Sequence, residues 1–105
     1  MTSWGHLQNA VLTLVGEGTL RERIVRCCLT NLAGVRLKEL PQEVHAPFLE
    51  LVGLVHVRDD QQSASVIAAL SDADLRRLAA AIVEMYDAVA RYQPRPIMGR
   101  TGPRI

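Results

Sequence analysis

The residues of this chain that could do chemistry begin with a pair of adjacent cysteines. Cys27 and Cys28 are the two cysteines of the 105-residue sequence. Neighbouring side chains on a helix point about 100° apart, and a zinc site needs four ligands, so the pair alone does not indicate a metal centre. A disulfide between neighbours would close a strained small ring. We therefore expect both thiols to be free and buried as small apolar side chains.

The three histidines are the next candidates for chemistry. His6, His45 and His56 lie in different segments, and none has a second histidine or cysteine at metal-ligand spacing. An enzyme centre built from His45, His56 and nearby carboxylates would require these segments to converge in the fold. Histidines on the surface or at helix ends are the simpler interpretation. We expect no enzyme activity, no metal and no cofactor.

Two short motifs have structural explanations. Ser71-Asp-Ala-Asp74 is typical of a helix start, where a serine side chain and acidic residues satisfy the first amide groups. Gly16-Glu-Gly18 lacks the preceding strand and the following Lys-Ser/Thr of a phosphate-binding loop. These glycines instead indicate the end of a helix.

The elements that must position these residues are helices, because apolar residues recur at three- and four-residue spacing. Four main helices are expected, over residues 3–15, 19–34, 41–55 and 72–92. Residues 58–65 are polar and indicate an exposed connection, with room for a short extra helix near 63–70. No stretch alternates as a strand would. The predicted fold class is all-α, a compact bundle of four main helices.

Start signals support two of these helices, and prolines complicate a third. Thr19 and Glu22 have the spacing of a capping box. Pro41 suits a first helical position, whereas a proline as far in as Pro47 removes a backbone hydrogen bond. Two alternatives stay open for this segment: a kinked helix, or a short turn over 41–46 followed by a helix from Pro47.

Composition limits the size, location and partners of the protein. Apolar residues make up 49% of the chain and aromatic residues 4%, so the core is expected to consist of Leu, Val, Ala and Ile. One helical domain is expected over 1–92, followed by a flexible basic Pro/Gly/Arg tail over 93–105. Neither a secretory signal nor a membrane-length apolar run is visible, which favours a cytoplasmic protein. The net charge of +1 generates no strong overall field.

Partner binding is the function that this pattern favours, as a non-enzymatic protein-interaction or self-association module. Basic residues of the second helix, two that lie close beyond it, and those of the tail are the candidate contacts: Arg21, Arg23, Arg26, Arg36, Lys38, Arg95, Arg100 and Arg104. The alternative is a small nucleic-acid-associated regulator that uses the same residues, although no recognition helix or aromatic platform accompanies them. The tail could also dock on a partner as an extended segment.

Two further features bear on self-association. Asn31 falls on the apolar stripe of the second helix, where it either fixes the register of a helix pair or oligomer, or lies at the edge of the stripe in water. Alanines 79–81 and Ala88 allow close approach to the last helix, which favours a symmetric homodimer.

The caps and core positions also carry a resemblance. Four segments resemble those of small, uncharacterised bacterial all-helical proteins: Glu17–Arg23, Leu40-Pro41 with Phe48, Leu70-Ser-Asp72, and Ala81–Tyr86. The resemblance spans most of residues 7–87 and implies an all-helical fold in a bacterial cytoplasm. It implies no activity, cofactor or site residue.

Overall fold

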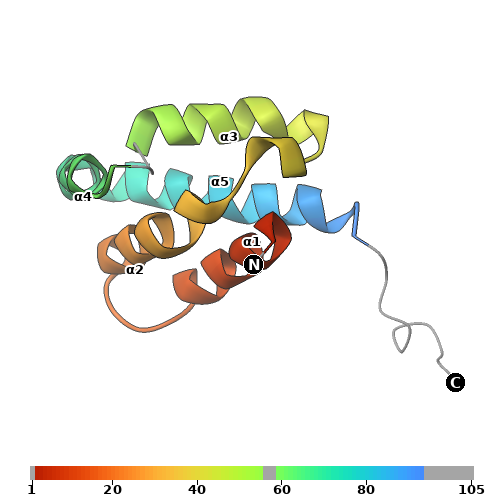
Figure 1. Ribbon diagram of the computed structural model, residues 1–105. Helices are drawn as coiled ribbons and strands as arrows, with labels where there is room; N and C mark the ends of the chain where they lie inside the picture. The colour runs from red at the N-terminus through yellow and green to blue at the C-terminus, as the bar shows by residue number, and fades with distance from the viewer. Residues whose placement is uncertain (1, 56–58, 94–105) are drawn as a thin grey trace, which may run out of the picture.

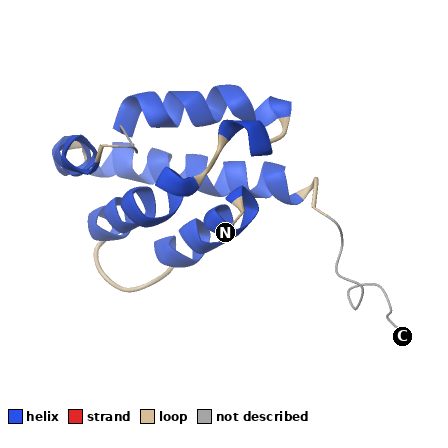
Figure 2. Cartoon of the chain, viewed as in Figure 1, coloured by secondary structure: helices blue, strands red, loops and turns tan. Residues whose placement is uncertain are grey.

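The computed structural model describes residues 2–55 and 59–93, and this part of the chain is helical without strands (Figure 2). The predicted all-α class is confirmed. Five α-helices are present, rather than four: α1 (Ser3–Leu14), α2 (Leu20–Arg26), α3 (Gln42–Val55), α4 (Asp60–Ala69) and α5 (Asp72–Ala90). The predicted tail, with Arg95, Arg100 and Arg104, lies outside the described residues from position 94 onward, and so does His56.

The helix starts follow from local hydrogen bonds that the sequence encodes. Thr19 accepts a hydrogen bond from the Glu22 amide at 3.1 Å, and the Glu22 carboxylate accepts one from the Thr19 amide at 2.8 Å, which confirms the capping box. Interactions of the Glu22 carboxylate with the Thr19 amide, then with the Thr19 side chain, and the nearby Arg26 charge lower the pKa of Glu22. Ser71 caps α5 in the same way, by accepting from the Asp74 amide at 3.1 Å. Gly18 has φ +100°, so it supplies the left-handed turn before α2.

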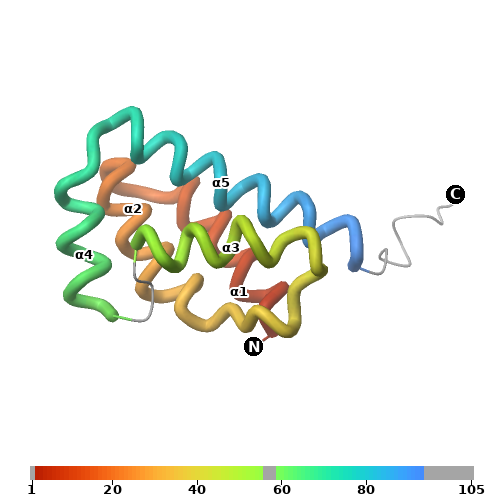
Figure 3. Tube along the Cα trace, turned by 90° about the horizontal axis from the view of Figure 1, so that it is seen from above, coloured from red at the N-terminus to blue at the C-terminus, as the bar shows by residue number. Residues whose placement is uncertain are grey.

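Helix α5 is the central element of the bundle. It contacts α1, α2 and α3, and in Figure 1 it runs between α3 above and α1 and α2 below. Seen from above in Figure 3, it runs along one side of the molecule. Helix α4 crosses one end of the bundle and contacts α2 and α3. In the described part of the chain, no helix combines the length and the apolar character that crossing a membrane requires.

The buried apolar side chains form one connected core. Phe48 of α3 lies in it at 2% exposure, surrounded by aliphatic residues, as the composition indicates. Trp4 of α1 stacks on Tyr86 of α5, with ring centroids 5.1 Å apart and ring planes at 12°. Val15, the last residue of the first helix as expected over 3–15, lies beyond the end of α1 and is 72% exposed.

The predicted second helix changes its hydrogen-bonding pattern partway along. After α2, a π-helical turn covers Cys27–Asn31 and a 3₁₀ turn covers Leu32–Gly34. A π turn bonds each amide to the carbonyl five residues back, which widens the helix. Both cysteines and Asn31 are buried in this wider turn. The 3.6-residue period used for the sequence cannot show such a change.

Helices α3 and α4 correct two expectations. Helix α3 is a single element with Pro47 inside it, so the alternative of a turn over 41–46 and a helix from Pro47 is wrong. Helix α4 begins at Asp60 within the segment expected to be an exposed connection, because the Asp59 carboxylate accepts from the Gln62 amide at 3.1 Å and caps it. Of α4, only Ser63 and Ile67 are buried, which explains its weak periodicity.

Candidate functional site

A groove lies between α3 and α5 on the surface of the described residues. Its main section encloses about 630 Å³. The apolar side chains that line it are Pro47, Leu51, Leu54, Leu70, Leu78 and Ala81. Leu51 and Leu78 are each 4% exposed and belong to the core, whereas Leu54 is 52% exposed. An apolar partner could therefore bury Leu54 without disturbing the core beneath it.

The groove continues toward the C-terminal end of α5. A narrower section of about 160 Å³ is lined by Glu43, Val44 and Met85, among others. Pro47, Ala81 and Glu84 line both sections, which makes them one continuous channel, here called the α3–α5 groove. Space exists along it because small side chains of α5, Ala81 and Ala88, lie opposite α3.

The charged residues of the α3–α5 groove are mostly acidic. Among the described residues that line it, Arg77 is the one basic residue, and it pairs with Asp74 at 2.9 Å. Glu50 and Glu84 also line the groove. Neither has a basic partner within 4.0 Å in the described part of the chain. The groove thus combines apolar side chains with two carboxylates that a basic ligand could pair with.

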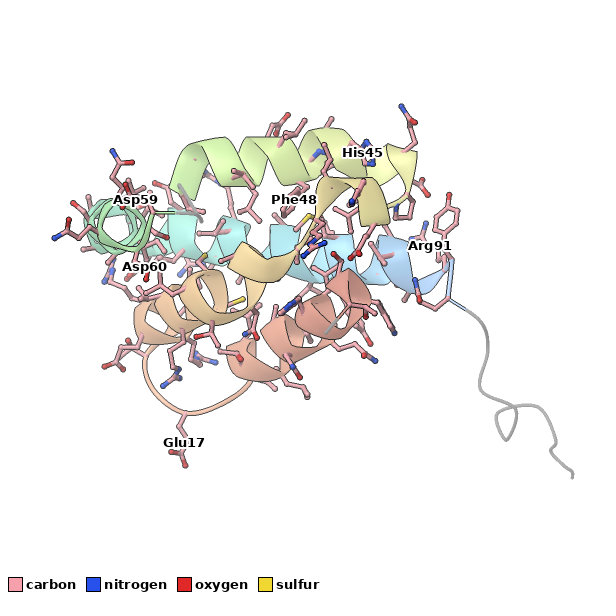
Figure 4. The ribbon with its side chains drawn as sticks, viewed as in Figure 1. Glu17, His45, Phe48, Asp59, Asp60 and Arg91 are labelled. Carbon is pink, nitrogen blue, oxygen red and sulfur yellow. The ribbon has the colours of Figure 1, made fainter. Side chains whose placement is uncertain are left out.

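One end of the groove lies beside the end of the described chain. The Tyr92 hydroxyl donates to the Glu43 carboxylate, and this hydrogen bond raises the pKa of Tyr92. Arg91 at the end of α5 pairs with Asp87 at 2.7 Å and is labelled in Figure 4. Because Glu43 lines the narrow section, the Tyr92 contact holds the C-terminal end of the helical body at the mouth of the groove.

The basic residues predicted from the second helix have internal partners. Arg21 donates to the Ile67 and Leu70 carbonyls at the end of α4. Arg23 donates to the Leu14 carbonyl at the end of α1. Arg26 donates to the Glu17 carbonyl in the connection between α1 and α2. Contact of these three arginines with a protein or nucleic-acid partner stays a prediction.

Arg36 and Lys38 belong to a different part of the molecule. Arg36 lies just before the 3₁₀ turn Leu37–Glu39, and Lys38 lies within it, next to Glu39. The Glu39 carboxylate accepts hydrogen bonds from Ser3, at 2.6 Å from Oγ and 3.1 Å from the amide. These bonds, and then the Arg36 and Lys38 charges, lower the pKa of Glu39. The two basic residues are exposed near the start of α1. Arg21 and Arg23 of α2 instead reach the ends of α4 and α1.

The two cysteines, His6 and His45 do not gather into a site in the part of the chain that the structure describes. Cys27 and Cys28 are free and fully buried, as expected. Burial raises the pKa of each thiol to about 12, and the proximity of Cys28 adds to the rise at Cys27. His45 Nε2 lies 2.9 Å from the Leu40 carbonyl, and His6 lies against Gly34. Among residues 2–55 and 59–93, no group of three metal-binding side chains occurs.

Asn31 has a partner in its own molecule. It is 5% exposed, and its Nδ2 donates to Thr13 Oγ1 at 3.1 Å. Thr13 Oγ1 in turn donates to the Asn9 carbonyl at 2.8 Å. Asn31 is therefore buried and does not lie in water at the edge of the stripe, and its hydrogen bond joins the π turn to α1. A role in the register of an oligomer stays a prediction. These three residues also line an open polar hollow of about 550 Å³.

The α3–α5 groove was not predicted from the sequence, because its walls come from helices that are distant along the chain. Ala81 and Ala88 were recognised as allowing close approach, but they were assigned to a symmetric dimer, which stays a prediction. The chain matches no family model, no curated protein and no solved structure. The resemblance to small bacterial helical proteins likewise stays a prediction.

Proposed function

We propose that this protein is a non-enzymatic helical interaction module whose α3–α5 groove binds a basic segment of a partner protein. The observation that carries this proposal is the coincidence of exposed Leu54 with the carboxylates of Glu50 and Glu84 in one groove. Apolar contact supplies affinity at such a surface, and charge complementarity selects the partner. The segment we expect therefore carries arginine or lysine beside leucine-like side chains.

Many polar side chains of the fold already make internal hydrogen bonds, which supports a binding role rather than a catalytic one. Serine and threonine hydroxyls cap helices, and Arg21 and Arg23 satisfy carbonyls at helix ends. Both cysteine thiols are buried, with their pKa values raised away from the reactive range. The carboxylates of Glu50 and Glu84 remain at the groove without such internal roles.

Isothermal titration of the full chain with synthetic peptides tests the proposal. The probe is a peptide of about twelve residues that carries arginines and leucines, and its matched controls replace either the arginines by glutamate or the leucines by serine. Binding of the first peptide alone is expected. Glu50→Gln with Glu84→Gln should raise its Kd about fivefold, since exposed ion pairs contribute about 0.5 kcal/mol each.

A substitution at Leu54 tests the apolar contact of the partner with the groove. Leu54→Ser should raise the Kd about tenfold, from about 1.5 kcal/mol of lost apolar contact. Val15→Ser is the matched control, because Val15 is 72% exposed and lies outside the groove. Glu17→Gln is the control for charge, since Glu17 projects from the opposite side of the molecule to α3 (Figure 4). No binding, or a Kd that the groove substitutions leave unchanged, would overturn the proposal.

A further inference from the structure

We propose that the C-terminal segment of this chain, residues 94–105, binds the α3–α5 groove of its own molecule. This inference rests on the proposed function, because it names an occupant for the same groove. It makes the segment an internal competitor that a partner must displace. The charge, the apolar content and the length of the segment favour it as the occupant.

The composition of the segment matches the groove. Residues 94–105 contain Arg95, Arg100 and Arg104 with no acidic residue. The remaining residues carry nine basic and eleven acidic side chains, a net charge of −2. Ile97 and Met98 stand between the first two arginines, so apolar and basic groups alternate along the segment. That is the combination expected to contact Leu54, Glu50 and Glu84.

The segment also begins at the right place. Tyr92 binds Glu43, which lines the narrow end of the groove, so the chain leaves the described body beside the groove mouth. From Ala88 to Asp74 the groove follows α5 for about 21 Å, at about 1.5 Å per helical residue. Residues 94–105 reach about 40 Å when extended, at about 3.3 Å per residue. The segment is therefore long enough to turn back and follow the whole groove.

Paramagnetic relaxation measured on the full chain tests this proposal. A nitroxide attached to Thr101→Cys should remove most of the amide signal intensity of α3 residues 48–54 and α5 residues 74–84. Cys27 and Cys28 are buried, so the introduced cysteine is the one that reacts readily. Glu50→Gln with Glu84→Gln should restore much of the lost intensity, and Glu17→Gln should not.

Mixing experiments separate binding within one molecule from binding between two. A ¹⁵N-labelled chain without nitroxide, mixed with an unlabelled chain that carries it, should show no signal loss. Signal loss in that mixture would show that a second copy supplies the segment, and it would overturn the proposal. Uniform or absent signal loss in the full chain would overturn it as well.

The peptide titration distinguishes this inference from the proposed function. The R95Q/R100Q/R104Q chain should bind the arginine–leucine peptide with a Kd lower by about twofold or more, because its groove is no longer occupied. Peptide binding at the groove with an unchanged Kd in this variant would overturn the inference and leave the proposed function in place. Failure of both chains to bind any peptide would overturn the proposed function.

Discussion

Gly34 and Gly53 show how differently two glycines in helical segments can be constrained. A Cβ added at Gly34 would lie 2.4 Å from His6 Nε2, far inside contact distance, so the imidazole occupies the space that a side chain would need. A Cβ added at Gly53 would meet no atom within 4 Å. Close packing of His6 thus explains Gly34, whereas Gly53 in α3 has no steric reason to be glycine.

Alanine substitutions at the two glycines should have opposite effects on the free energy of unfolding. Gly53→Ala should raise the free energy of unfolding by about 0.5–1 kcal/mol, because alanine restricts the unfolded chain and favours the helix. Gly34→Ala should lower it, since His6 must move. Urea unfolding followed by the fluorescence of Trp4, the one tryptophan, measures both. Equal effects of the two substitutions would contradict this account of the packing.

The buried thiols predict a loss of stability at alkaline pH. Unfolded thiols lose their protons near the ordinary pKa of 9.0, whereas burial holds the pKa of Cys27 and Cys28 at about 12. Above pH 9 the free energy of unfolding therefore falls by about 1.4 kcal/mol per pH unit for each thiol. Urea unfolding at rising pH should show this slope, and a variant with alanine at both positions should show a shallower one. The same slope in both proteins would rule out the thiols as its cause.

At the scale of elements, side chains from distant segments complete the ends of helices. Neither α1 nor α4 has a basic residue in its last turn, and Arg23 and Arg21 of α2 supply the missing charge to their terminal carbonyls. Helix α1 has no acid in its first turn, and the Glu39 carboxylate supplies the negative charge there by accepting a hydrogen bond from the Ser3 amide. Side chains of α2 and of the turn before α3 thus form hydrogen bonds to the ends of neighbouring helices, and their charges interact favourably with the helix dipoles.

This arrangement predicts a stability cost for the α2 arginines. Arg21→Gln and Arg23→Gln should each lower the free energy of unfolding by about 1 kcal/mol, the scale of a capping hydrogen bond from a charged group at a partly exposed site. Arg76→Gln, an exposed arginine of α5, serves as the control and should change little. Urea unfolding at neutral pH decides the matter. If all three variants unfold alike, the α2 arginines do not act as caps.

Most helix starts could be predicted from the sequence, because capping is local. Thr19 with Glu22, and Ser71 with Asp74, begin helices where their spacing indicates. Asp59 followed by Gln62 has the same spacing and marks the start of α4, a signal that the weak apolar pattern of this helix concealed. The π turn, the partners of the α2 arginines and the α3–α5 groove depend on contacts between distant segments, which local patterns do not contain.

For the whole molecule, the distribution of charge between the body and its last residues has the widest consequence. The body carries a net charge of −2 while residues 94–105 carry three arginines. An overall charge near zero therefore conceals two complementary parts. The α3–α5 groove places acidic and apolar side chains together on the body. On this account, binding takes place at that groove, and the arginines of α2 serve the fold.

The most direct test is to map the bound arginine–leucine peptide by ¹⁵N NMR titration of the full chain carrying R95Q/R100Q/R104Q. The account predicts shift changes concentrated at Leu51, Leu54, Leu78 and Ala81, with little change in α1 and α2. Shift changes centred on Arg21, Arg23 and Arg26 instead, or spread without focus over the chain, would contradict it.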